Sequence, residues 1–224
     1  MVHVRRTIER ADKSVIAMFA EVSPALAHEA MGRTGAMDAG LKPIYSGMKV
    51  CGPAITAQCH PGDNVMLHKA LALAQPGDVI VASMGLVDTG AWGEVLTTSA
   101  VARGVAGLVI DGMVRDGLGI KNLGFPVFSR GLCMKGTVKE TIGLVNHPIC
   151  CGGVTVNPGD IVIGDDDGVV VIPRANATEE LIRRCHDREQ REHEMMEKLR
   201  AGVTTVDLLG LDAMLKAKGL QEEG

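Results

Sequence analysis

The chain has 224 residues, a formal net charge of −4, and 46% hydrophobic but only 2% aromatic residues. That length suits one domain, or one domain with an appendage. The scarcity of aromatic side chains argues against stacking on nucleic-acid bases, and the mild acidity argues against a large phosphate-binding surface. We therefore expect no nucleic-acid partner, although a small anionic substrate would need only one or two local cations.

Strands and helices alternate through the first three quarters of the chain. Ser23-Pro24 opens a helix, because Ser is a good N-cap and Pro fits the first helical position. Pro76-Gly77 and Pro158-Gly159 each form a turn that starts a strand. The predicted strands are residues 50–59, 79–83, 108–111, 127–129, 161–164 and 169–172, together with a β-rich stretch over residues 149–156 in which Gly152-Gly153 is a bend between strands. The predicted helices are residues 23–32, 64–74, 93–103 and 118–123. This rhythm predicts an α/β fold with some parallel pairing.

The last quarter is different, because it is strongly charged and helical. We expect an amphipathic helix over residues 178–199 and a last helix over residues 205–218. A tail this charged rarely packs wholly into its own domain. We therefore predict a catalytic α/β domain over residues 1–176 and a helical arm over residues 177–224 that packs on a neighbouring subunit.

Four features that the sequence lacks indicate the setting of the protein. The N-terminus has no apolar leader, and no apolar run reaches the roughly 18 residues of a membrane span. The six cysteines show no C-x-x-C spacing, so we expect buried, reduced thiols. We expect the turn at Asp165-Asp166-Asp167-Gly168 to be a hairpin and not a calcium loop. The expectation is a cytoplasmic protein with no membrane partner.

The first motif that could carry chemistry is Gly93-Glu94-Val95-Leu96, where a loop becomes a helix. The free N–H groups at a helix start, together with the helix dipole, favour an anion. The alternative is purely structural, with Gly making the turn and Glu interacting with the dipole.

The second motif is Arg115-Asp116, which follows the predicted strand 108–111. Ligands of α/β sheets bind at the carboxyl ends of strands. Arg suits a carboxylate and Asp suits Mg²⁺, although an ordinary surface ion pair is the alternative. One helix connects the two motifs, so both can lie on one rim. A metal and an Arg around a 2-oxo acid would stabilise an enolate.

Several linked stretches resemble one family. They are residues 28–35 (HEAMGRTG), 61–68 (PGDNVMLH), 93–116 (GEVLTTSAVARGVAGLVIDGMVRD), 124–129 (GFPVFS) and 157–171. Together they resemble the class II pyruvate aldolases of the 4-hydroxy-4-methyl-2-oxoglutarate / 4-carboxy-4-hydroxy-2-oxoadipate type, which share a fold with the RraA regulators of ribonuclease E. The resemblance covers roughly residues 5–200.

The resemblance implies a single α/β domain with a central β-barrel or sandwich flanked by helices, assembled as a homotrimer or homohexamer. It implies metal-dependent cleavage, with Mg²⁺ or Mn²⁺, of a 4-hydroxy-2-oxo dicarboxylic or tricarboxylic acid to pyruvate and a second oxo acid. Oxaloacetate decarboxylation would be a side activity. The partner is then a small oxo acid.

The resemblance also implies roles for individual residues. Arg115 would bind the pyruvyl carboxylate and keto oxygen, Asp116 would bind the metal directly, and Glu94 would contact it through water. The helix start would bind the substrate carboxylate through Gly93 and the amides of Val95 and Leu96.

More distant contacts follow from the same resemblance. Asn64 and His68 would contact the distal carboxylate of the substrate. Glu192, or Glu189 in a similar register, would approach the metal through water from the arm of a neighbouring subunit.

Two positions depart from the family pattern. Glu94 stands where the family usually has Asp, and Gly119 stands where the family commonly has an acidic residue. Two alternatives are therefore kept. One is a non-catalytic RraA-type regulator of ribonuclease E, and the other is a related oxo-acid lyase with a different substrate.

Overall fold

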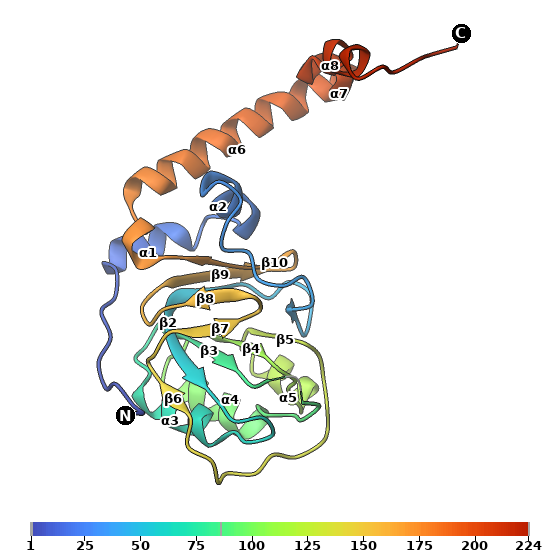
Figure 1. Ribbon diagram of the computed structural model, residues 1–224. Helices are drawn as coiled ribbons and strands as arrows, with labels where there is room; N and C mark the ends of the chain where they lie inside the picture. The colour runs from blue at the N-terminus through green and yellow to red at the C-terminus, as the bar shows by residue number, and fades with distance from the viewer. Residues whose placement is uncertain (1, 86, 224) are drawn as a thin grey trace. The chain divides into compact units, whose positions relative to one another are not determined.

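The computed structural model describes residues 2–85 and 87–223, and the chain divides into two compact units, Met1–Ile182 and Arg183–Gly224 (Figure 1). All of the strands belong to the first unit. They are β1 (Lys42–Pro43), β2 (Val50–Gln58), β3 (Val79–Ser83), β4 (Gly107–Asp111), β5 (Val127–Ser129), β6 (Leu144–Val145), β7 (Ile149–Cys151), β8 (Val154–Val156), β9 (Ile161–Asp165) and β10 (Gly168–Ile172).

The main sheet is mixed and nearly closed, in agreement with the predicted barrel. Its order is β1-β5-β4-β3-β2-β9-β10, with β6 also paired to β2. Strands β2 to β5 run parallel, whereas β1, β9 and β10 join as antiparallel neighbours. One short segment touches both edges of the sheet, since Ala36 bridges to Val170 of β10 and Lys42 pairs with Ser129 of β5.

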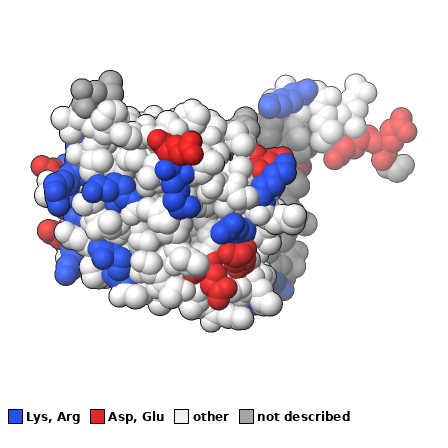
Figure 2. Space-filling view, turned by 90° about the horizontal axis from the view of Figure 1, so that it is seen from below, with Lys and Arg blue, Asp and Glu red and all other residues white. Residues whose placement is uncertain are grey.

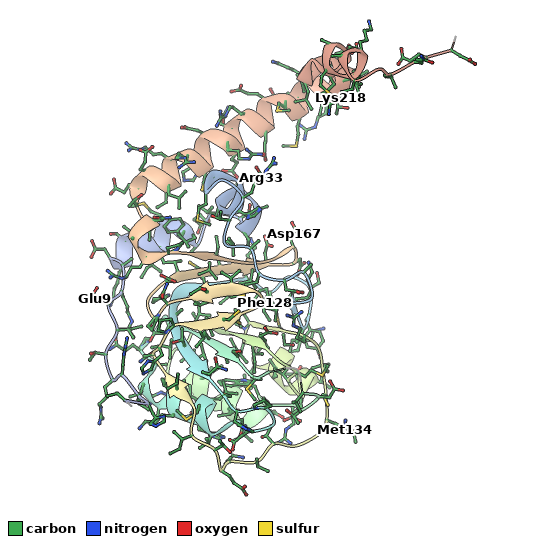
Figure 3. All side chains as sticks on the ribbon, in the orientation of Figure 1. Glu9, Arg33, Phe128, Met134, Asp167 and Lys218 are labelled. Atoms are coloured by element: carbon green, nitrogen blue, oxygen red, sulfur yellow. The ribbon has the colours of Figure 1, made fainter. Side chains whose placement is uncertain are left out.

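Both faces of the parallel strands are buried. Successive side chains of a strand point to opposite faces, and each face is covered by other elements. One layer packs Ile55, Ile80 and Leu108 against helices α3 (Val65–Leu73) and α4 (Glu94–Ala102). The other layer contains Val81 and Phe128 and is covered by the hairpin β7–β8. Phe128 is fully buried there (Figure 3). The parallel strands thus form a scaffold, packed on both faces, that positions the loops at their ends.

The predicted helices of the first unit are present with small shifts at their ends. Ser23 caps α2 (Pro24–Ala30) by accepting a hydrogen bond from the amide of Leu26 at 3.2 Å. Helix α5 (Gly117–Asn122) ends before Gly124, whose φ is +64°. Four short elements were not predicted. They are α1 (Lys13–Phe19), β1, β6 and the 3₁₀ helix η1 (Arg174–Asn176).

The long charged helix α6 (Glu179–Arg200) continues from the first unit into the second. The predicted last helix is two helices, α7 (Thr205–Leu209) and α8 (Leu211–Ala217). Gly210 divides them because its left-handed φ of +62° ends one helix and starts the next. The boundary at residue 177 and the packing of the arm on a neighbour stay predictions.

All six cysteines are free. Cys59, Cys151 and Cys185 are buried as expected, but Cys150 is exposed, so the expectation of buried thiols is wrong at that position. Burial raises the pKa of Cys59 and Cys151 to about 12. The turn between β9 and β10 is the expected hairpin. Within the described residues, no helix has the length and apolar character that a bilayer crossing requires.

Candidate active site

The site forms where the loops after β3 and β4 meet. The amide of Ala91 donates to the carbonyl of Met113 at 2.9 Å, and the amide of Arg115 donates to the carbonyl of Trp92 at 2.8 Å. These two bonds join the loops directly. The structure therefore brings the two sequence motifs together on one rim of the sheet.

A buried Trp fixes the loop that leads into α4. Trp92 is fully buried and donates from Nε1 to Oγ1 of Thr97 at 2.7 Å. The Thr97 hydroxyl in turn donates to the carbonyl of Gly93 at 3.0 Å. The Trp92 ring also stacks on Phe125, with 6.2 Å between ring centroids. The start of α4 is thus held in place by the core beneath it.

The first turn of α4 has free donors. Among the described residues, the amides of Val95 and Leu96 have no hydrogen-bond partner, as expected for the first turn of a helix. Both residues line a pocket of about 270 Å³. An anion at this point would meet two N–H groups and the positive end of the helix dipole.

Asp116 has a left-handed backbone conformation, with φ +56° and ψ +39°. Few residues other than Gly adopt this region, and Asp is one of the types that enter it more readily. Oδ2 of Asp116 accepts a hydrogen bond from the amide of Glu94 at 3.2 Å and lies 3.6 Å from Nε of Arg115. Within the described part of the chain both contacts involve Oδ2, which leaves Oδ1 for another ligand.

An ion-pair network around Arg130 fixes the start of the loop that carries Arg115. Arg130 donates from Nε to Oδ1 of Asp111 at 2.8 Å and from Nη1 to Oδ1 of Asp38 at 2.7 Å. Asp111 also accepts the amide of Gly152 at 2.8 Å through Oδ2. Both oxygens of the last residue of β4 are thus satisfied, which fixes the direction in which the chain leaves the strand.

The opposite wall of the pocket comes from α3 and from the segment 136–139. It includes Asn64, His68, Thr137 and Lys139. Asn64 is 6% exposed and donates from Nδ2 to the carbonyl of Ala91 at 2.8 Å. Its Oδ1 is buried and has no partner among the described residues. This buried acceptor is unsatisfied, which costs free energy unless a donor group reaches it.

Lys139 is a pocket residue that the sequence analysis did not find. Its segment is pinned by the buried carboxylate of Asp63, which accepts the amides of Val65 at 2.8 Å and of Glu140 and Thr141 at 2.6 Å each. Burial opposes the charge of Asp63, but the three N–H groups outweigh it and lower the pKa. Partial burial, with the charge of Lys139 added, lowers the pKa of His68.

Two predicted residues lie outside the pocket wall. Glu94 lies at its edge, with its carboxyl group against the Cα atom of Gly119 on α5. Glu192 lies on α6 in the second unit and pairs with Arg188 at 2.9 Å. Its approach to Asp116 of another subunit stays a prediction.

The carboxylates present suit a hard cation. No three His, Cys, Asp or Glu side chains of the described residues are grouped closely enough to hold a metal alone. Mg²⁺ is commonly held by only one or two carboxylates, with water and substrate completing its shell. Asp116, with Oδ1 available and Glu94 beside it, fits that pattern and does not fit an all-protein zinc site.

Charged side chains are dispersed over one face of the molecule (Figure 2). On the face shown in Figure 2, Lys and Arg side chains are spread over the surface, and acidic side chains stand next to several of them. Met134, which is 92% exposed, projects from the segment that follows β5 (Figure 3). On the face shown in Figure 2, the cations are separated and do not form one continuous positive patch.

Comparison with known proteins gives consistent matches. A protein of Halalkalibacterium halodurans named "Putative 4-hydroxy-4-methyl-2-oxoglutarate aldolase" is 35% identical over 198 residues, which cover 87% of this chain and 94% of that protein. The structure of Streptomyces coelicolor RraAS2, described as an unusual member of the RNase ES inhibitor RraA protein family, is 32% identical with a TM-score of 0.76 and covers 85% of this chain and 99% of that one.

A structure from Pseudomonas syringae pv. tomato is 30% identical with a TM-score of 0.77, and covers 88% of this chain and 93% of that one. The family RraA-like, described as Aldolase/RraA, matches residues 19–171. These residues contain both walls of the pocket and all of the parallel strands. The chain therefore belongs to the RraA-like (Aldolase/RraA) family.

Proposed function

We propose that this chain is a divalent-metal-dependent aldolase that cleaves a 4-hydroxy-2-oxo dicarboxylic or tricarboxylic acid to pyruvate and a second oxo acid. One observation carries the proposal. Arg115, Asp116, Val95 and Leu96 all line one pocket, and among the described residues the amides of Val95 and Leu96 have no hydrogen-bond partner. Such a set can bind a 2-oxo carboxylate and stabilise negative charge on its keto oxygen.

The proposed reaction is a retro-aldol cleavage. The C4 hydroxyl loses its proton, the C3–C4 bond breaks, and its electrons pass into the C2 carbonyl to give the enolate of pyruvate. A proton added at C3 then gives pyruvate. Arg115 contributes by holding the oxygen on which negative charge develops, and the amides of Val95 and Leu96 hold the adjacent carboxylate.

Asp116 would hold a divalent cation directly, and Glu94 would contact it through water. The cation would supply Lewis-acid polarisation of the keto group. The same stabilisation of an enolate would allow decarboxylation of oxaloacetate. Mg²⁺ or Mn²⁺ are the proposed ions because carboxylate oxygens suit both.

The other wall supports a substrate with a hydroxyl group and a second carboxylate. The free acceptor Oδ1 of Asn64 suits the hydrogen of a hydroxyl group better than the carboxylate that the resemblance implied, because a carboxylate has no proton to donate. Lys139 and His68 offer donors to a distal carboxylate. This division of donors and acceptors favours a hydroxylated oxo acid.

Pyruvate release tests the proposal. Wild type should release pyruvate from 4-carboxy-4-hydroxy-2-oxoadipate, 4-hydroxy-4-methyl-2-oxoglutarate or oxaloacetate with Mg²⁺ or Mn²⁺ and not with EDTA. Arg115→Ala should lower kcat by about 10²-fold or more, because the lost contact strengthens in the transition state. Arg33→Ala is the matched control, since that side chain is 75% exposed and pairs with Glu29 on α2. Metal-independent activity, or an active Arg115→Ala variant, would contradict the proposal.

A regulatory role like that in the description of the Streptomyces relative is the second candidate. A regulator of ribonuclease E needs neither Arg115 nor a metal. Binding of ribonuclease E in a pull-down, unchanged by Arg115→Ala and by EDTA, together with no pyruvate release, would favour this role.

The proposed assembly is a homotrimer or homohexamer in which the arm completes the site of a neighbour. Light scattering measures the mass of the assembly directly. Glu192→Gln should lower turnover without changing that mass, whereas Glu197→Gln on the same helix is the control. Equal turnover in both variants would remove Glu192 from the site.

A further inference from the structure

At the starts of α4 and α5, one carboxylate from each start lies against a glycine of the other. Asp116, directly before α5, lies against Gly93, directly before α4, so closely that a Cβ atom at Gly93 would collide with Oδ2. Glu94, the first residue of α4, lies against Gly119 of α5, where a Cβ atom would come within 2.5 Å of both Cδ and Oε2. Each acid thus occupies space that a side chain of the other helix start would fill.

The backbone conformation at position 119 does not require a glycine. Gly119 lies within a helix and is absent from the residues with positive φ. Gly is less favourable than Ala in a helix, so helix formation alone would favour a side chain here. Close approach of another group is the remaining local use of Gly, and the carboxyl group of Glu94 is the group that approaches.

We propose that Gly119 is the positioning residue for the second carboxylate of the site, and that residues 94 and 119 act as one unit. The proposal rests on the proposed function, because Glu94 matters only if the site beside Asp116 is used. It assigns to Gly119 a role that involves no contact with the substrate. The space at Gly119 decides where the Glu94 carboxylate lies.

An added methyl group should therefore move a carboxylate and leave the fold intact. The atoms that it would meet are the far end of the exposed, flexible side chain of Glu94. That side chain can turn away, while the amide of Glu94 keeps its bond to Asp116. The backbone and side-chain contributions of Glu94 can thus be separated by a change at another residue.

A double-mutant cycle tests this coupling. The variants are Gly119→Ala, Glu94→Ala, Glu94→Asp, and Gly119→Ala combined with each change at Glu94. Pyruvate release gives kcat and KM, electron paramagnetic resonance gives the affinity for Mn²⁺ in the absence of substrate, and thermal unfolding gives stability. Leu118→Ala, an exposed neighbour on the same helix, is the control for a general effect on α5.

Gly119→Ala should lower kcat/KM and Mn²⁺ affinity by about tenfold, a coupling typical of contacting residues, while the Tm stays equal or rises. In the Glu94→Ala background the same change should have almost no further effect. Glu94→Asp should restore part of the activity of Gly119→Ala, because the shorter acid leaves room for the methyl group. Equal losses with and without the Glu94 side chain would overturn the proposal, as would full activity of Gly119→Ala.

A crystal structure of Gly119→Ala separates two kinds of failure. If wild type releases no pyruvate but the variant shows a displaced Glu94 carboxylate, the proposed function fails while the positioning role of Gly119 stands. If Glu94 keeps its place in the variant, the positioning role is overturned, whatever the activity of wild type.

Discussion

Asp63→Asn tests whether one buried carboxylate holds the distal wall of the pocket. Asp63 is 1% exposed, and its two oxygens accept three amides, from Val65, Glu140 and Thr141. Asn offers one acceptor oxygen and an NH₂ group that cannot accept. At least one of the three amides therefore loses its partner, and the others lose the charge that strengthens their bonds.

The expected cost is about 2 kcal/mol of unfolding free energy, since one net hydrogen bond is worth roughly 1 kcal/mol and bonds to charged groups are worth more. For a chain of this size that lowers the Tm by about 4 to 8 °C. The amides of residues 137–141 should exchange with deuterium faster than in wild type. Because Lys139 lies in this segment, KM for a dicarboxylate should rise more than kcat falls.

The effect should depend on pH in a defined direction. The hydrogen-bonded amides hold the pKa of Asp63 below its ordinary value despite burial. The stabilising contribution of Asp63 is thus complete above the unfolded pKa of about 3.9 and is lost as the pH falls through the lower, folded value. The difference between wild type and Asp63→Asn should therefore shrink in acid.

Asp166→Asn is the matched control. Asp166 lies in the β9–β10 turn, where the Ser46 hydroxyl and the Gly47 amide lower its pKa. It contacts no part of the pocket wall, so this change should leave KM unaltered. The reasoning is refuted if Asp63→Asn unfolds within about 0.5 kcal/mol of wild type, the scale of a neutral surface change, and its segment 137–141 exchanges at the wild-type rate.

Three further predictions concern the surroundings of the site. Gly93→Ala should lower kcat/KM at least about tenfold with little loss of stability, because its methyl group displaces the carboxylate of Asp116. In native protein the exposed Cys150 should react first with a thiol reagent, whereas burial raises the pKa of Cys151 to about 12 and should keep it unreactive; equal rates would contradict this. Arg130→Ala should cost about 1 to 2 kcal/mol in chemical denaturation, because its carboxylate partner at the end of β4 loses a charged donor.

Much of the fold could be predicted because its signals are local. Apolar runs of strand length alternate with amphipathic segments, and turns such as Pro76-Gly77 separate them. The placement of Glu94 and Arg115 on one rim of the sheet could also be predicted from chain order, because one helix connects the two motifs. The prediction of one helix over residues 205–218 was wrong at Gly210, because a single Gly inside a helical pattern is often tolerated.

The distal wall could not be predicted, because its contacts are not local. Lys139 lies in a segment with no periodicity, and it reaches the pocket through Asp63, which is 76 positions earlier in the chain. The two departures from the family pattern, Glu94 and Gly119, were separate observations in the sequence. In the structure they are the two sides of one contact.

The pocket is built from two walls that different parts of the chain supply. The wall with Arg115 and Asp116 depends on the loops after β3 and β4, which are hydrogen-bonded to each other and contain the buried Trp92. The distal end depends on α3 and the segment 136–139. Under the proposed function, a change in the distal wall would therefore alter which acid is accepted while the wall with Arg115 and Asp116 keeps its geometry. Substitutions in the segment 136–139 alone would then shift the substrate range.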